Sequence, residues 1–575
     1  MHKKQIVPVL VVLGLILIIS GFIIGNSLIE KYTPTDERKD LAEYYNITEE
    51  TQVAITLNHK ILEQYATLID GHVYLDFDFV HDMINSRFYW DANENILLYT
   101  TAEDVISAAS GATRYMVGKN TTEYGRAIVK ATGQSALIDL EFVKQYSDIR
   151  YEYFEEPSRL VLYNEWDEIT VSTLKKDSEV RLKGGIKSPI LTNVKKGDTL
   201  TILEMGEDWA TVCTTDGIVG YIKTSFIKNT EQKTLESDYV KETFQHISLK
   251  EPINLLWDPI YNTSGNDGIQ STLTNTKGVN VICPSWFKLK DNEGNLTSYA
   301  SLDYVNYCHS QGVQVWGMVK NLDISEGVDI NYILTHTSAR QNLVNKIVAR
   351  AMDYNLDGIN IDFEQLSESK IGDGYIQFLR ELSTKCEDNH IILSTAVYTP
   401  ASYNSVYKYG EQADFVDYIA LMTYDQHYGQ ASGEGSVAGL DWVENGIQNT
   451  IAEGVPANQI LMGVPFYTKL WKLTPTSDDS ATEVIYQITF ENLGLSSAKK
   501  WMDNNINKPT WLEDCGQWYG ELKQDTIVYK MWLEDNDSIE KKLQLANTYE
   551  LAGAAYWSDD LDNTGVWEII IKYIN

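Results

Sequence analysis

The stretch Leu356–Leu366, LDGINIDFEQL, places carboxylates inside what otherwise reads as a buried strand. Successive side chains of a strand point to opposite faces. Asn360, Asp362 and Glu364 therefore share one face, and apolar residues occupy the other. Asp357 has the opposite parity and stands at the beginning of the strand, so we expect it to be a turn or structural group. The pattern predicts a strand that points an amide and two acids toward an interior site.

This stretch belongs to a series of apolar strands that alternate with amphipathic helices over the last part of the chain. Such alternation indicates a parallel sheet with crossover connections, and eight strands predict a (β/α)₈ TIM barrel over residues 251–575. Glu364 stands at the carboxyl end of its strand, where the active sites of such barrels are built. A small α+β insertion is expected over about 468–550. The expected strands are 253–257, 279–284, 313–319, 358–364, 391–397, 416–424, 460–466 and 553–557.

Four motifs of this region resemble those of glycoside hydrolase family 18, the chitinase-like enzymes. DGINIDFE (357–364) is similar to the family's D-G-x-D-x-D-x-E motif. LMTYD (421–425), GVPFY (463–467) and AAYW (554–557) resemble motifs of its later strands. The resemblance covers about 250–575. It implies substrate-assisted retaining catalysis, in which the 2-acetamido oxygen of an N-acetylglucosamine unit attacks the anomeric carbon.

The resemblance also implies a role for each matching residue. Glu364 is the acid and then the base for water, and Asp362 orients the acetamido group and stabilises the positive intermediate. A neighbouring carboxylate raises the pKa of an acid, so we expect Asp362 to keep Glu364 protonated. Tyr424 donates to the acetamido oxygen, and Asn360 completes the catalytic group. The expected substrate-binding residues are Asp425, Trp557, Tyr467, Met422 and Trp316.

The tryptophans near the ends of the first three strands allow two readings. Trp257, Trp286 and Trp316 can either stack on a sugar or pack inside the barrel, and the sequence does not decide between them. His427 lies close to the sixth-strand motif and is expected to make a loop or substrate contact.

Asn360 departs from the pattern of many chitinases, which have Asp at this position. The same Asn is usual, as far as the resemblance goes, in spore and cell-wall hydrolases, so peptidoglycan is the expected substrate. Chitin or a chitooligosaccharide is the alternative. Two other classes are a sugar-binding envelope protein without catalysis, which the retained Glu364 disfavours, and a structural envelope or sporulation protein.

The N-terminus reads as a membrane segment. Lys3 and Lys4 precede an uncharged apolar run from Ile6 to Gly25, which is about as long as a bilayer crossing requires. The two lysines are expected to keep the N-terminus in the cytoplasm. No small-x-small cleavage pattern follows, so residues 1–25 predict an uncleaved signal anchor in preference to a removed signal peptide. Both readings place the rest of the chain outside the cytoplasm, in a bacterial cell envelope.

An internal repeat occupies the next part of the chain, after an expected tether at 26–48. Leu68–Thr100 aligns with Ser135–Asn164, and each copy reads as a strand, a helix and two strands around a turn. Residues 49–166 resemble the copper amine oxidase N-terminal-like domain of envelope proteins. That name refers to a fold and not to copper.

Residues 167–229 show short alternating strands separated by turn residues and resemble a bacterial SH3-like domain. Such modules often bind cell-wall peptides or polysaccharides, and the alternative is a spacer with a packed core. A charged linker is expected at 230–250.

Composition excludes nucleic acid as a partner. The 575 residues contain 47 Lys and Arg against 81 Asp and Glu, a net charge of −34, whereas nucleic acid attracts basic surfaces. No His/Cys cluster has zinc spacing and no phosphate-binding glycine motif is present, so we expect no metal and no cofactor. We expect a monomer.

Overall fold

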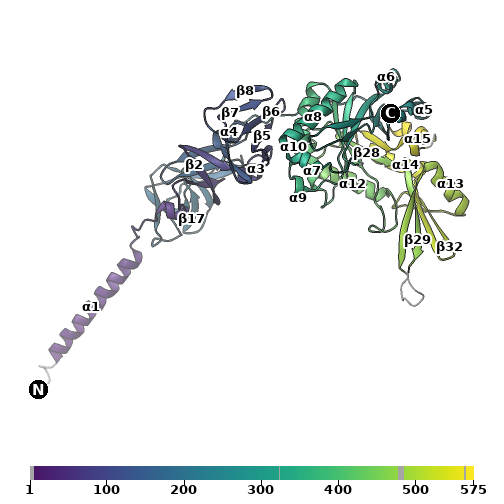
Figure 1. The fold of residues 1–575 in the computed structure, drawn as a ribbon. Helices are drawn as coiled ribbons and strands as arrows, with labels where there is room; N and C mark the ends of the chain where they lie inside the picture. The colour runs from purple at the N-terminus through teal and green to yellow at the C-terminus, as the bar shows by residue number, and fades with distance from the viewer. Residues whose placement is uncertain (1–5, 323, 477–484, 563–564, 575) are drawn as a thin grey trace. The chain divides into compact units, whose positions relative to one another are not determined.

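The computed structural model describes residues 6–322, 324–476, 485–562 and 565–574 (Figure 1). The chain divides into two compact units. The first unit contains Met1–Trp90, Ala108–Tyr115 and Glu123–Lys241, and the second contains Asp91–Ser107, Met116–Thr122 and Glu242–Asn575.

The first unit begins with helix α1 (Ile6–Tyr32), which is longer than the apolar run. Within it, the 23 residues Leu10–Tyr32 are long and apolar enough to cross a membrane, a test that a signal sequence also passes. Helix α1 therefore agrees with both readings of the N-terminus.

The segment expected to be a tether is partly attached to the SH3-like strands. Two residues separate the end of α1 from Thr35, whose amide donates to the Ile186 carbonyl at 2.9 Å. A β-bridge joins Arg38 to Ile190. The structure thus differs from a free tether, because the backbone groups of this segment find partners on the neighbouring sheet.

The two repeat copies fold alike, and the expected order of strand, helix and two strands is confirmed. In both copies a strand runs directly into a helix whose N-cap Asp, Asp76 or Asp139, accepts from the first-turn amides. The first copy contains β3 (His72–Asp76), α3 (Phe77–Met83), β4 (Phe88–Asp91) and β5 (Ile96–Thr100), and the second contains β10 (Ser135–Asp139), α4 (Leu140–Gln145), β11 (Arg150–Phe154) and β12 (Arg159–Tyr163).

The SH3-like domain is a single sheet with the order β15-β14-β18-β17-β16-β13-β19. Its core contains Val180, Ala210, Val212 and Ile222, which are all fully buried. Strand β19 pairs with β13, so the sheet continues into the segment expected to be a linker. The strands are β13 (Glu168–Thr173), β14 (Ser178–Arg181), β15 (Ile190–Val194), β16 (Thr199–Glu204), β17 (Trp209–Cys213), β18 (Val219–Lys223) and β19 (Glu231–Thr234).

The second unit contains the expected closed barrel of eight parallel strands. The pairings run in order around the barrel, and the pairing of β21 with both β20 and β24 closes it. Figure 1 shows helices such as α8 (Thr337–Asp353), α10 (Gly374–Asp388) and α12 (Leu440–Ala452) around the strands. The barrel strands are β20 (Ile253–Asp258), β21 (Val281–Pro284), β24 (Gln314–Lys320), β25 (Gly358–Asp362), β26 (Ile392–Tyr398), β27 (Tyr418–Met422), β28 (Ile460–Pro465) and β34 (Gly553–Trp557).

Strand β25 has the predicted division of its faces. Ile359 and Ile361 are fully buried in the outer cluster that contains residues of α8 and α10. On the inner side lies a second apolar cluster, which includes Trp257 and Met318. Asp357 accepts from the Val315 amide at 2.8 Å, in agreement with its expected structural role.

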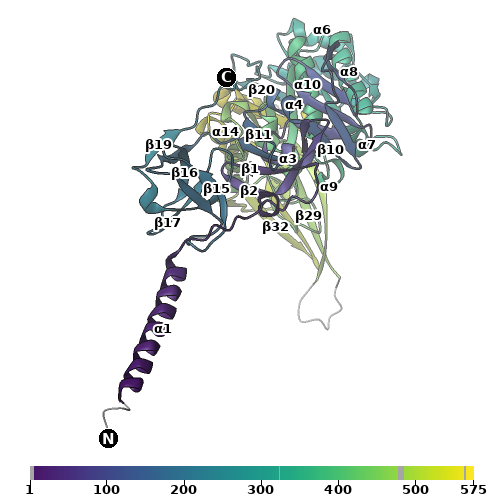
Figure 2. The same ribbon diagram turned by 90° about the vertical axis from the view of Figure 1, so that its left-hand side faces the viewer.

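In the described residues between β28 and β34, the insertion is a five-stranded antiparallel sheet with the order β30-β29-β33-β32-β31, together with helix α13 (Leu495–Asn505). Figures 1 and 2 show β29 and β32 projecting away from the barrel strands. Helix α14 (Asn536–Thr548) follows the sheet and packs in the barrel's own core cluster. The other elements are β29 (Tyr467–Pro475), β30 (Tyr486–Gly494), α13 (Leu495–Asn505), β31 (Thr510–Leu512), β32 (Gln517–Gln524) and β33 (Ile527–Leu533).

Candidate active site

Asn360 lies in the middle of β25 and is fully buried. Its register partners are Met318 on β24 and Ser394 on β26. The side-chain amide donates to Ser394 Oγ at 2.9 Å. On the other side, the Trp257 indole N–H donates to Asn360 Oδ1 across a long 3.5 Å contact. Asn360 thus stands behind the site as a neutral, hydrogen-bonded group.

Asp362 is the next inward side chain and is only 8% exposed. Its Oδ1 atom is buried and accepts no hydrogen bond from any residue that the structure describes. Burial, and then the charge of Glu364, raise the pKa of Asp362 well above its ordinary value, while Lys320 opposes the shift. The deeper carboxyl, Asp362, therefore has a raised pKa, which was not predicted from the sequence. Because the charge of Glu364 acts on Asp362, we expect the two carboxyls to titrate as a coupled pair.

Glu364 lies just beyond the end of β25 and is half-buried. Asn321, directly after β24, contacts its backbone twice: the Asn321 amide donates to the Glu364 carbonyl, and Glu364 N–H donates to Asn321 Oδ1, both at 2.8 Å. The hydroxyl of Tyr398, the last residue of β26, donates to Glu364 Oε2 in a short hydrogen bond. A residue after β24 thus holds the Glu364 backbone, and the last residue of β26 contacts its carboxylate.

Tyr424 and Asp425 follow β27 and face the same region. Burial, followed by the charges of Asp362 and Glu364, raises the pKa of Tyr424 well above its ordinary value, so its hydroxyl keeps the proton that a donor needs. Asp425 has a positive φ of 60° and forms an ion pair with Lys469 of the insertion.

One cavity of about 180 Å³ connects these groups. Carboxylates and tyrosines line one part, and Trp257 and Trp557 another, with ring centroids 6.0 Å apart and planes inclined at 60°. Polar groups beside flat apolar rings suit a sugar, which presents hydroxyls at its edge and C–H groups on its face. The lining residues are Trp257, Met318, Asp362, Glu364, Ala396, Tyr398, Met422, Tyr424, Asp425, Tyr467 and Trp557.

The cavity brings together all the predicted site residues except two. Asn360 lies behind Asp362 and does not line it. Trp316 is fully buried, donates to Gln314 Oε1 at 3.0 Å and stacks on Tyr418 with ring centroids 5.7 Å apart. Its register partner is Gly358, at the beginning of β25. The prediction that Trp316 binds substrate is therefore corrected, because its ring lies one layer deeper and packs the barrel.

Sequence reasoning missed Tyr398 and Asn321. Both stand at or just after the carboxyl end of a strand next to β25, which is a signal that could have found them. Trp257, for which the sequence left two readings open, lines the cavity. His427 contacts the Ser432 carbonyl at 3.0 Å, as a loop residue does.

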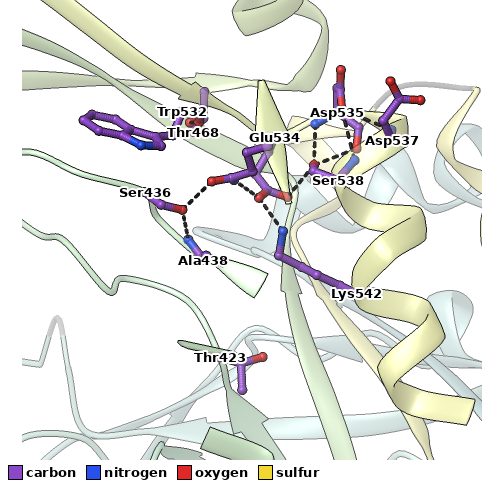
Figure 3. Close-up of polar contacts among 12 residues, drawn as sticks. Thr423, Ser436, Ala438, Thr468, Trp532, Glu534, Asp535, Asp537, Ser538 and Lys542 are labelled. Carbon is purple, nitrogen blue, oxygen red and sulfur yellow. Dashed lines mark hydrogen bonds and ion pairs between the residues drawn. The ribbon is translucent and has the colours of Figure 1, made fainter. Parts of the chain in front are cut away.

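A buried polar chain connects the loop after β27 to the insertion and to α14 (Figure 3). Ser436 donates to Gln517 Oε1 at 2.5 Å, and the Gln517 amide donates to Glu534. Lys542 donates to Glu534 at 2.7 Å, and both side chains are fully buried. Figure 3 shows Lys542 reaching from helix α14 to Glu534. The loop that follows Tyr424 and Asp425 is thus attached to a rigid support.

No group of three or more His, Cys, Asp or Glu side chains within the described ranges is arranged to hold a metal ion. The polar groups of the cavity are carboxyls, phenols and the indoles of Trp257 and Trp557, and such groups can perform acid–base chemistry on a bound sugar.

Comparison with known proteins gives relatives over the barrel region. The chain is 22% identical over 324 residues to YvbX, an uncharacterised glycosylase of Bacillus subtilis (strain 168), which covers 54% of this chain and 89% of that protein. It is 26% identical over 250 residues to a cortical fragment-lytic enzyme of the same organism, covering 42% of this chain and 56% of that protein. The chain thus spans most of the first relative but only about half of the second.

A solved structure has the same fold. It is the C-terminal domain of a candidate chitinase from Desulfitobacterium hafniense DCB-2, with a TM-score of 0.51 and 21% sequence identity, and the match covers 57% of this chain and 100% of that one. Among family models, that of the bacterial SH3 domain matches residues 177–228. The model of glycosyl hydrolases family 18 matches residues 263–562, which is more than half of the chain, and the chain therefore belongs to that family.

Proposed function

We propose that this glycoside hydrolase cleaves β-1,4 linkages next to N-acetylglucosamine units of peptidoglycan by substrate-assisted retaining catalysis. The main observation in support of this proposal is that the carboxyls of Asp362 and Glu364 line one sugar-sized cavity together with Tyr424 and Trp557. Substrate-assisted catalysis needs an acid, an acceptor for the acetamido N–H and a donor to the acetamido oxygen. Glu364, Asp362 and Tyr424 supply these three functions in turn.

The unpartnered Oδ1 of Asp362 explains how the acid becomes protonated. In the empty cavity the raised pKa of Asp362 keeps the shared proton on that carboxyl. An acetamido N–H that donates to Asp362 stabilises the ionised form of this group. The proton of the pair then goes to Glu364, which delivers it to the leaving oxygen. Substrate binding thus protonates Glu364, the acid, and leaves Asp362 as the anion whose charge balances the oxazolinium-like intermediate.

The preference for peptidoglycan over chitin rests on Asn360 and on one relative. The buried Asn keeps a hydrogen bond behind Asp362 without adding a third carboxyl. The relative is the Bacillus subtilis protein described as a cortical fragment-lytic enzyme. Chitin remains the alternative, since both polymers contain the same acetamido sugar.

The N-terminal half would keep the enzyme at the cell envelope. Helix α1 supplies a membrane anchor, and the SH3-like and repeat domains separate it in the sequence from the barrel. The substrate is then reached from the outer side of the cytoplasmic membrane.

Digestion of purified peptidoglycan and of chitin by the full chain in detergent, with mass analysis of the products, tests this proposal. We expect peptidoglycan fragments that end in reducing N-acetylglucosamine, and no fragments with Glu364→Gln. Glu550→Gln is the matched control, because Glu550 is exposed and precedes β34 at the opposite end of the barrel. Cleavage of chitin but not of peptidoglycan would overturn the assignment of the substrate. Activity in Glu364→Gln would overturn the assignment of the catalytic acid.

A further inference from the structure

The backbone that carries Glu364 is fixed on both sides. Asn321, which is only 6% exposed, makes the two 2.8 Å hydrogen bonds to the Glu364 amide and carbonyl. On the other side, the buried hydroxyl of Tyr407 donates to the carbonyl of Phe363 at 2.8 Å. The main chain of the acid therefore cannot shift without breaking buried hydrogen bonds.

Tyr398 acts on the carboxylate itself. Its hydroxyl donates to Glu364 Oε2. Its own backbone is anchored by the Tyr409 hydroxyl, which donates to the Tyr398 carbonyl at 2.9 Å. Its ring meets that of Tyr407 edge-on, with centroids 6.3 Å apart. Neighbouring tyrosines thus hold the Tyr398 ring in place, and its hydroxyl faces the carboxyl that delivers the proton to the leaving oxygen.

A hydroxyl that donates to a carboxylate favours the ionised form of that carboxylate. Glu364 has such a donor in Tyr398, whereas Oδ1 of Asp362 has none among the described residues. The two carboxyls therefore differ in a defined direction before substrate arrives.

We propose that Tyr398 is a positioning residue for the catalytic acid, which keeps Glu364 oriented and ionised in the empty site so that the shared proton stays on Asp362 until a sugar binds. The inference rests on the proposed function of Glu364 and names a residue outside the motifs of the chain. One proton moves, from Asp362 to Glu364, and Tyr398 keeps its own proton throughout.

Tyr398→Phe and Tyr407→Phe form a matched pair of variants. Each removes one phenol oxygen from the same aromatic cluster, but only the first removes a donor from the carboxylate. For Tyr398→Phe, cleavage of peptidoglycan should show a kcat about tenfold lower with little change in KM. The basic limb of its pH profile should move up by about one pH unit, because the carboxyl holds its proton more firmly. For Tyr407→Phe the limb should stay in place.

Thermal unfolding gives a readout that needs no substrate. The hydroxyl of Tyr398 donates to the ionised form of Glu364, and this stabilisation is present at pH 8 and is lost only as pH falls below the ordinary pKa of a glutamate, about 4.3. Tyr398→Phe should therefore lower the Tm of the barrel more at pH 8 than at pH 3, by about 2 °C or more. Tyr407→Phe should lower it by the same amount at both pH values.

The outcomes separate this inference from the proposed function. If Glu364→Gln retains activity, the assignment of the acid is wrong. If Glu364→Gln is inactive but Tyr398→Phe loses Tm equally at both pH values, or keeps the wild-type basic limb, the role of Tyr398 is overturned and the proposed function stands. A raised KM with an unchanged kcat would make Tyr398 a substrate contact and would also overturn the inference.

Discussion

Asp362 links the stability of the barrel to pH. Its pKa in the folded chain lies above that of an unfolded Asp. As pH rises above about 4, the unfolded state loses this proton first, and the free energy of unfolding falls until pH passes the folded pKa. Asp362→Asn has no such ionisation. It should therefore gain stability over the wild type between pH 4 and pH 8, by more than about 1.4 kcal/mol, the equivalent of one pKa unit.

Calorimetry of both proteins at the two pH values measures that gain, and parallel stability curves would contradict it. The same variant should lose about 10²-fold or more in kcat, because the amide cannot balance the positive charge of the intermediate. A variant that is more stable but less active is expected where function maintains a buried carboxyl.

Asn360 offers the complementary change, which adds a charge. Asn360→Asp places a third carboxyl behind Asp362 with a hydrogen-bond partner in Ser394. Like-charge repulsion then raises the pKa of the pair, so the basic limb of the pH–rate profile should move up by about half a unit or more. KM should stay within about threefold, because the residue does not line the cavity. A pH–rate curve that coincides with that of the wild type would refute this account.

At the scale of elements, the ion pair of Glu534 and Lys542 connects β33 and the segment after it to helix α14. Both side chains are fully buried, and burial raises the pKa of Glu534 in spite of the lysine. Lys542→Met should cost about 3–5 kcal/mol, because it leaves a buried carboxylate without its cation. The loss should be larger at pH 8 than at pH 5, where Glu534 can take up a proton.

Chemical denaturation measures the free energy of unfolding of the barrel in each variant. Lys541→Met, at the exposed neighbouring position, is the control. The double variant Glu534→Gln, Lys542→Met should recover much of the stability, since neither buried charge remains. A double variant no better than Lys542→Met would show that packing of the lysine stem, and not its charge, supports the loop after β27.

Sequence alone predicted most of the elements because each barrel strand has a local pattern. Alternation along 358–364 assigned the inner and outer faces correctly, and the repeat assigned the strand–helix–strand order of the first unit. Depth along the barrel axis is not a local property. Trp316 has the right parity, but its partner Gly358 lies four residues before Asp362. Tyr398 and Asn321 lie 34 and 43 residues from Glu364 in sequence. They contact it only because their strands are neighbours of β25 in the barrel.

At the scale of the whole molecule, charge and chain order bear on the proposed location at the cell envelope. A net charge of −34 keeps a long chain soluble, and the candidate cavity lies in the half of the sequence remote from the apolar helix. Burial raises the pKa of Asp362, so the deeper carboxyl of the site holds its proton more firmly than an exposed Asp does.

Helix α1 decides whether that enzyme is anchored or released. The 23 residues Leu10–Tyr32 span about 35 Å at 1.5 Å per residue, which exceeds the hydrocarbon core of about 30 Å. The apolar core of a cleaved signal peptide is shorter, at roughly 7–15 residues. We therefore expect the full chain, expressed in a bacterial host, to stay with membranes through an alkaline wash and to keep its first residues by intact mass.

Two arginine substitutions on the same helix provide the control. Leu17→Arg places a charge near the middle of the apolar segment, at a cost of about 2.5–3.5 kcal/mol, and should reduce membrane retention. Glu30→Arg places the same side chain near the end of α1, where it can reach water, and should leave retention unchanged. A mature N-terminus beyond residue 25, with the barrel released into the medium, would show that the helix is a removed signal sequence, and the front domains alone would then have to hold the enzyme at its polymer.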